Sequence, residues 1–171
     1  MLQATEPQNE RDAAHLRLLN HYLHSADNAR QFFKSGRDDI DLPAVLPGVC
    51  VEKAGSEGGA EAAKRWFNVE HAALISCIGM ASRDPQHDAY TWQLAWVIKQ
   101  YLDRRGRWGE IVTTHRAALD AALRLADPLG EAFMPWAGEG DGDPRPCRGG
   151  QGSHGAFGGT LRRDQGPRSQ W

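Results

Sequence analysis

Residues 101–108 have the sequence Tyr101-Leu102-Asp103-Arg104-Arg105-Gly106-Arg107-Trp108, which predicts the end of one helix, a glycine turn and the start of a second helix. Glycine suits such a turn because it adopts the left-handed backbone that commonly ends a helix. Beyond Trp108, small and apolar residues recur at helical spacing. A helical hairpin of this kind buries its apolar face against neighbouring hairpins, which favours a scaffold over a catalytic pocket.

Apolar residues are distributed unevenly along the chain. It has 171 residues, enough for one modest domain, and a net charge of -2. With a pI near 6.4, the overall charge gives no argument for nucleic-acid binding. From Met134 onward there is one leucine, no isoleucine and no valine, whereas ten of the 19 glycines lie there. We therefore expect residues 133–171, a Gly/Pro/Arg-rich tail, to be disordered.

Cysteine usage and the N-terminal segment indicate the expected compartment. Cys50, Cys77 and Cys147 are widely spaced and form no CxxC motif, which argues against a disulfide framework or a structural zinc site. The first ten residues lack the basic and apolar regions of a signal peptide, and no apolar run approaches the roughly 20 residues of a membrane span. These features predict a cytoplasmic protein without a membrane partner.

The periodicity predicts an all-α fold made of antiparallel helical hairpins. Residues 1–9 form a flexible lead-in, residues 10–34 a first helix, residues 35–58 a Pro/Gly-containing linker, and residues 59–132 the hairpins. Within the last segment, helices are expected over residues 59–82, 87–105 and 108–125. A fifth helix starts near Asp127 and is not expected to develop.

Local signals place the helix ends and the linker. Ser35-Gly36 should end the first helix, and Ser56 should be the N-cap of the second. We expect the linker to lie across the helices, with four apolar anchors: Ile40, Leu42, Val45 and Leu46.

One set of residues is expected to build the packed interior and the central turn. Large aromatic side chains bury extensive area, and small or apolar residues recur at helical steps around them. The set comprises Trp66, Phe67, Trp92, Trp96, Leu102, Gly106, Trp108, Ala118 and Leu119.

Two local groups of polar residues suggest chemistry, and each has a structural interpretation that we favour. His21 and His24 lie three residues apart on one helix but have no third metal ligand nearby, so His21 is interpreted as a polar surface residue and His24 as a capping or packing residue. Glu70 and His71 are adjacent in a helix and point different ways, so we expect Glu70 to pair with a basic group or a backbone amide. The sequence predicts no catalytic residue, no metal site and no cofactor.

Basic residues offer the alternative hypothesis of nucleic-acid binding. Arg104, Arg105 and Arg107 cluster at the predicted helix end beside Asp103. Cations at a helix C-terminus are favoured by the helix dipole, which explains them without a ligand. The tail adds arginines between glycines: Arg145, Arg148, Arg162, Arg163 and Arg168. We expect no direct nucleic-acid contact, but this cluster and the tail keep a small nucleic-acid-binding protein as the alternative.

Five blocks of sequence resemble one family of bacterial regulators. They are residues 18–26 (LLNHYLHSA), 63–74 (AKRWFNVEHAAL), 89–96 (AYTWQLAW), 102–108 (LDRRGRW) and 115–122 (HRAALDAA). In this order they resemble the AfsR/SARP-type transcriptional regulators, at the point where the NB-ARC ATPase module leads into the first tetratricopeptide repeats. The resemblance implies a TPR-like α-solenoid start and a non-enzymatic sensor or docking role.

The resemblance also sets expectations about completeness and partners. The chain carries neither the phosphate-binding loop nor the DNA-binding motif of the intact regulators, and the repeat pattern stops after Ala132. We therefore expect a truncated or frameshifted fragment. Its partner should be a protein, either an unidentified regulator or a second copy of the chain. No small-molecule substrate is evident, and the apolar face of the fourth helix, residues 108–125, should be partly uncovered.

Overall fold

The fold is all-α, as the sequence predicts. The computed structural model describes residues 8–33 and 39–133. These contain α1 (Gln8–Arg30), α2 (Gly59–Ala81), the 3-10 turn η1 (Pro85–His87), α3 (Asp88–Arg104), α4 (Trp108–Leu125) and α5 (Pro128–Phe133). No strand occurs within the described residues. Three predicted features lie outside the described residues, wholly or in large part: the lead-in, the Ser35-Gly36 helix end and the tail beyond Phe133.

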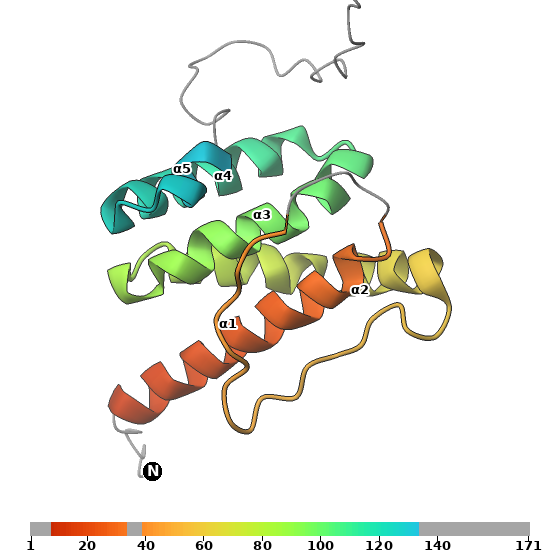
Figure 1. The fold of residues 1–171 in the computed structure, drawn as a ribbon, viewed down its shortest axis with the longest axis horizontal. Helices are drawn as coiled ribbons and strands as arrows, with labels where there is room; N and C mark the ends of the chain where they lie inside the picture. The colour runs from red at the N-terminus through yellow and green to blue at the C-terminus, as the bar shows by residue number, and fades with distance from the viewer. Residues whose placement is uncertain (1–7, 34–38, 134–171) are drawn as a thin grey trace, which may run out of the picture.

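Helix α3 lies at the centre of the molecule. It packs against α1, α2 and α4, and Figure 1 shows it between the α4–α5 layer and the α1–α2 layer. Every residue from Tyr90 to Ile98 is buried. A helix that is buried all round must sit inside the fold rather than on its surface.

The α3–α4 hairpin forms around Gly106. Gly106 has a φ of +64°, a backbone conformation that residues with a side chain rarely adopt. Across this turn, the Arg107 amide donates to the Leu102 carbonyl at 3.0 Å. Helix α4 then begins at Trp108, with the amides of Glu110 and Ile111 donating to the Arg107 carbonyl. The opposite end of the hairpin is closed by an ion pair between Asp88 and Arg124.

Helix α1 is shorter than predicted. It ends at Arg30, four residues before Lys34, and two tight turns follow it. Phe33 turns inward and stacks on Phe67, with ring centroids 5.5 Å apart, while Phe32 lies against Gly55. These long-range contacts take the place of a further helical turn, and the periodicity of the sequence does not reveal them.

Two predictions about the second helix and the linker are wrong. Ser56 is not the N-cap of α2, because its hydroxyl donates to the Lys53 carbonyl; the N-cap is Gly58, with a φ of +107°. Among the expected anchors Ile40 is buried and Leu42 and Leu46 are half-buried, but Val45 is 48 % exposed. Polar side chains of α1, rather than Val45, hold this part of the linker.

The fifth helix does form, although it has only six residues. The Asp127 carboxylate accepts hydrogen bonds from the amides of Leu129 and Gly130, which fixes its first turn. A Cβ on Gly130 would lie 2.8 Å from that of Ala122, so this glycine lets α5 approach α4 closely. Among the described helices, none is long and apolar enough to cross a membrane.

Candidate functional site

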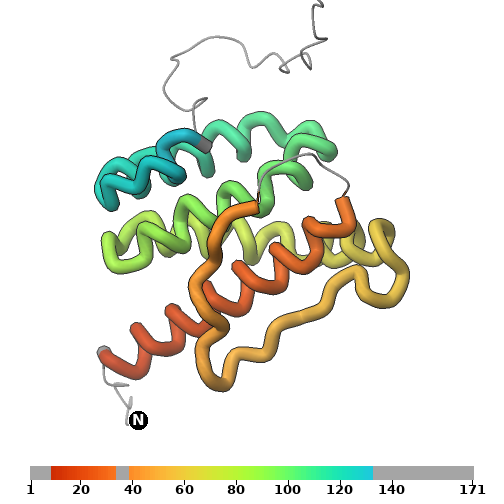
Figure 2. Tube along the Cα trace, in the orientation of Figure 1, coloured from red at the N-terminus to blue at the C-terminus, as the bar shows by residue number. Residues whose placement is uncertain are grey.

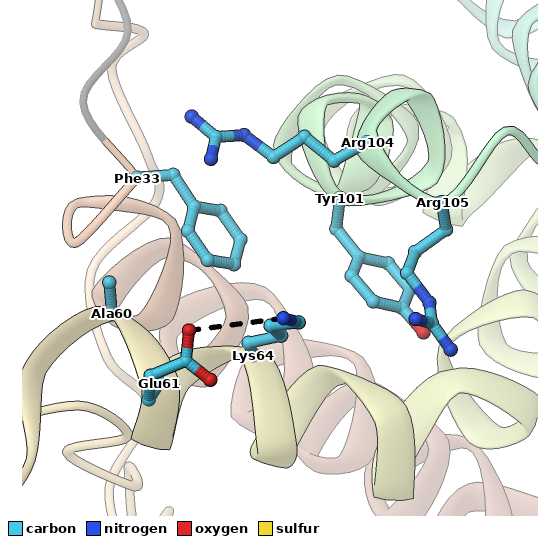
Figure 3. Close-up of a pocket in the computed structure, with 7 residues that line it drawn as sticks. All are labelled: Phe33, Ala60, Glu61, Lys64, Tyr101, Arg104 and Arg105. Atoms are coloured by element: carbon cyan, nitrogen blue, oxygen red, sulfur yellow. Dashed lines mark ion pairs between the residues drawn. The ribbon is translucent and has the colours of Figure 1, made fainter.

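A cavity of about 400 Å³ lies where three helix ends converge. Phe33 follows α1, three residues belong to the first turns of α2, and three belong to the last turn of α3 or its end. Figure 3 shows these side chains around one space. The lining residues are Phe33, Ala60, Glu61, Lys64, Tyr101, Arg104 and Arg105.

One wall of the cavity is a rigid aromatic stack. The ring of Phe67 lies between those of Phe33 and Tyr101, at centroid distances of 5.5 and 4.9 Å and interplanar angles of 25° and 12°. The Tyr101 hydroxyl donates to the Asn68 side chain at 3.1 Å, which fixes the outer ring. Of these three residues Phe33 and Tyr101 line the cavity, and the fully buried Phe67 lies between and behind them.

The rim of the cavity is basic. Lys64, Arg104 and Arg105 are exposed and carry three positive charges, against one negative charge on Glu61. Glu61 lies 3.8 Å from Lys64, a distance at which an exposed ion pair contributes little. The guanidinium of Arg104 lies 5.1 Å from the Phe33 ring centroid, where the ring face attracts a cation. The site therefore combines an excess of positive charge with an apolar wall.

This arrangement suits an anionic group joined to an apolar one. Guanidinium and ammonium groups donate charge-assisted hydrogen bonds to carboxylates and phosphates. The first turn of α2 also faces the cavity, and the amide end of a helix favours negative charge. The adjacent C-terminus of α3 acts in the opposite sense, so the basic side chains must dominate the attraction.

The sequence prediction located two of the cavity residues as one cluster. Arg104 and Arg105 line the site, whereas Arg107 does not and pairs with Glu110 at 3.0 Å. The sequence did not predict Phe33, Tyr101 or Lys64 as residues of a site. A signal was present: if α2 and α3 are antiparallel neighbours, the start of one lies beside the end of the other.

The expected packing residues occupy the interior and the central turn to different degrees. Phe67, Trp92, Trp96, Leu102 and Ala118 are buried. Trp66, Trp108 and Leu119 are only partly buried and pack on the core from its edge. Within this set, Phe67 lies directly behind the cavity. Gly106 forms the turn that follows Arg105.

Glu70 has a different partner from the expected one. The Tyr22 hydroxyl donates to its carboxylate at 2.8 Å, which joins α1 to α2. Burial, followed by this hydrogen bond, raises the pKa of Tyr22 to about 12. His71 instead contacts the Glu110 carboxylate at 3.0 Å and so joins α2 to α4. These contacts tie helices together, away from the cavity.

The two histidines of α1 also have separate surroundings. His21 forms a 2.6 Å hydrogen bond between its Nδ1 atom and the Cys50 carbonyl, and it lies 3.7 Å from the Glu52 carboxylate. His24 is half-buried. The structure thus places His21 against the linker that crosses α1.

Comparisons with protein-family models, with curated proteins and with solved structures found no match to this chain.

Proposed function

We propose that this chain is a non-enzymatic helical interaction module whose basic cavity binds an acidic segment of a partner protein. The observation that carries the proposal is the cavity itself, in which three cations surround a fixed aromatic wall. A carboxylate of the partner would lie among Lys64, Arg104 and Arg105, and a neighbouring apolar side chain would lie against Tyr101. Aromatic and arginine side chains are typical of residues that dominate binding energy at protein interfaces.

The resemblance to AfsR/SARP-type regulators supports the same role. In such a regulator, the region between the ATPase module and the TPR-like repeats would dock a partner and transmit that event. The antiparallel hairpins of α2, α3 and α4 are compatible with the start of a TPR-like array. We propose that the partner is a protein, either a regulator or a second copy.

Nucleic acid is the alternative ligand, because Arg104, Arg105 and Arg107 are all exposed. Glu61 beside the cavity and Glu110 beside Arg107 weaken the attraction for a polyanion. A protein carboxylate needs only one short set of basic contacts, whereas a nucleic-acid strand needs a longer basic track. The geometry therefore favours the acidic protein segment.

Fluorescence anisotropy tests the choice between these ligands. The probes are a labelled glutamate-rich peptide containing one phenylalanine and a labelled single-stranded oligonucleotide, each titrated with the full chain. We expect the peptide to bind more tightly, and Lys64→Glu and Arg105→Glu each to weaken its binding about tenfold. Arg116→Glu, the same charge change at an exposed position of α4, is the matched control.

Two results would count against the proposal. Equal loss of peptide binding in Arg116→Glu and Lys64→Glu would mean that net charge, rather than the cavity, attracts the peptide. Tighter binding of the oligonucleotide, with affinity falling steeply as salt increases, would favour the nucleic-acid alternative.

A further inference from the structure

A second surface lies on α1, where the segment of residues 39–52 crosses this helix. We call this segment the strap. Figure 2 shows it crossing α1 and then bending back toward α2, and the reversal is a turn at Pro47 and Gly48, where Gly48 has a φ of +80°. Most of its hydrogen bonds with the helices are made by its main chain.

Asn20 of α1 binds the strap with both ends of its amide group. Its Nδ2 atom donates to the Ala44 carbonyl at 3.1 Å, and its Oδ1 atom accepts from the Leu46 amide at 2.9 Å. A carboxamide that pairs with the carbonyl of one residue and the amide of the second residue beyond it fits an extended backbone. The side chains of the two strap residues take no part in this pairing, so it is independent of their identity.

Three more side chains of α1 continue the pattern along the strap. His21 binds the Cys50 carbonyl, the Ser25 hydroxyl accepts from the Glu52 amide at 3.0 Å, and Asn28 donates to the Glu52 carbonyl at 3.2 Å. From α3, Gln93 donates to the Asp41 carbonyl at 3.1 Å. These polar side chains all bind main-chain groups of the strap.

Side chains hold the strap mainly at its two ends, and at the first of these the Asp39 carboxylate accepts from Arg30 at 2.9 Å. Within residues 39–52, Ile40 is the one residue that is buried, and it lies at the beginning of the segment. Glu52 supplies one specific anchor at the other end, because Trp66 donates to its carboxylate at 2.7 Å. Between these two ends Leu42 packs partly against the core, and the other contacts are hydrogen bonds to the main chain of the strap, which do not depend on the identity of its side chains.

We propose that Asn20, His21, Ser25 and Asn28 form a binding surface for an extended peptide, and that the strap is its resident occupant. The partner segment would be bound through its main chain, would turn where the strap turns at Gly48, and would carry a carboxylate where Glu52 now meets Trp66. This surface is separate from the basic cavity, so the proposal does not depend on the function assigned above. A competing peptide can bind only to molecules in which the strap has left the surface. Its apparent affinity is therefore its intrinsic affinity multiplied by the fraction of molecules whose surface is free.

A labelled peptide with the sequence of residues 39–53, carrying Cys50→Ser, tests this proposal by anisotropy against the full chain. The strap-weakened variant is Leu46→Pro, which removes the amide that donates to Asn20. Leu46→Ala keeps that amide and is the matched control. We expect the peptide to bind the proline variant at least about tenfold more tightly than the wild type or the alanine control. Adding Asn20→Ala to the proline variant should abolish the gain.

Equal peptide affinity in all of these proteins would overturn the proposal. If circular dichroism shows that Leu46→Pro is unfolded, Glu52→Ala replaces it, because that change removes the Trp66 contact and leaves the backbone intact. Hydrogen exchange of the wild-type chain gives an independent answer. The amides of Leu46 and Glu52 should exchange much faster than those of α3, and exchange only through global unfolding would also overturn the proposal.

Discussion

At the residue scale, the most demanding position is Asp88, a carboxylate with 1 % of its side chain exposed. Burying a charge is unfavourable unless it is paired and hydrogen-bonded. Arg124 satisfies it with two hydrogen bonds of 2.8 and 2.6 Å, and these bonds raise the pKa of the Arg124 guanidinium. The pair joins the first residue of α3 to the last turn of α4.

Asp88→Asn should therefore destabilise the chain by about 1–3 kcal/mol, the usual range for losing a charged partner in a buried hydrogen bond. Urea unfolding followed by circular dichroism measures the change. In a double-mutant cycle, Arg124→Gln should cost much less once Asp88 has been replaced. Independent, additive effects of the two substitutions would contradict the interpretation of these residues as a coupled pair.

Burial controls the chemistry of one thiol. Desolvation raises the pKa of Cys77 to about 11, whereas Cys50 is exposed. In a Cys50→Ser, Cys147→Ser variant, we expect Cys77 to react with a thiol reagent at pH 8 about a hundredfold more slowly than in denaturant, because the thiolate is the reactive form. Equal rates in the native and unfolded chain would show that Cys77 is accessible.

The same shift in pKa gives a pH dependence of stability. The unfolded chain ionises Cys77 near its ordinary pKa of 9.0, whereas the native thiol stays neutral up to about 11. Stability should therefore be lost between these two values as pH rises, by at most about 1.4 kcal/mol per pH unit from this group. Cys77→Ala would remove this contribution to the pH dependence.

At the element scale, helix ends show what the sequence could and could not predict. The limits of α4, Trp108 and Leu125, agree with the prediction because local signals on both sides, Gly106 and Pro128, set them. The end of α1 was misplaced because the partners of Phe32 and Phe33 lie far along the chain. A periodicity analysis contains no information about such contacts.

The same limit applies to the candidate site and to the strap. Arg104 and Arg105 are neighbours in sequence and were predicted as one cluster, whereas Lys64 and Phe33 join them only through the packing of α1, α2 and α3. Asn20 likewise bonds to Ala44 and to the Tyr90 hydroxyl, 24 and 70 residues away. Long-range polar contacts of this kind leave no periodic signal in a single sequence.

The junction between α4 and α5 offers a test of helix termination. Ala126 has a φ of +51°, and the Asp127 amide donates to the Ala122 carbonyl across it. Because side chains disfavour this conformation, Ala126→Gly should stabilise the chain by about 1 kcal/mol. Ala13→Gly, at an exposed position inside α1, should have the opposite sign, with a loss of about 0.5–1 kcal/mol. Chemical denaturation measures both, and destabilisation by Ala126→Gly would contradict the assigned backbone.

At the scale of the whole molecule, the central helix is covered by its neighbours, whereas the α4–α5 end leaves large apolar side chains exposed. The central α3 is covered by α1, α2 and α4. At the α4–α5 end, however, Leu123, Leu125 and Leu129 are 55, 43 and 53 % exposed. Large apolar side chains that stay exposed at the end of a helical stack are typical of a surface that another hairpin or another copy covers.

We therefore expect the chain to self-associate through its α4–α5 end. Sedimentation velocity across a concentration series should show dimers or larger species for the wild type, and Leu123→Lys with Leu129→Lys should shift the population toward monomer. Val69→Lys, at a position on α2 that is 77 % exposed, is the matched control and should change nothing. A wild type that stays monomeric at high concentration would contradict this expectation.

Binding of an acidic segment in the basic cavity is tested most directly by an amide chemical-shift titration, which locates the bound peptide on the chain. With the glutamate-rich, phenylalanine-containing peptide added to isotope-labelled full chain, we predict that the largest shifts cluster at Lys64, Tyr101, Arg104 and Arg105. These shifts should disappear in Lys64→Glu and persist in Arg116→Glu. Shifts centred on α1 under the strap or on the α4–α5 end, or no shifts at all, would contradict binding in the cavity.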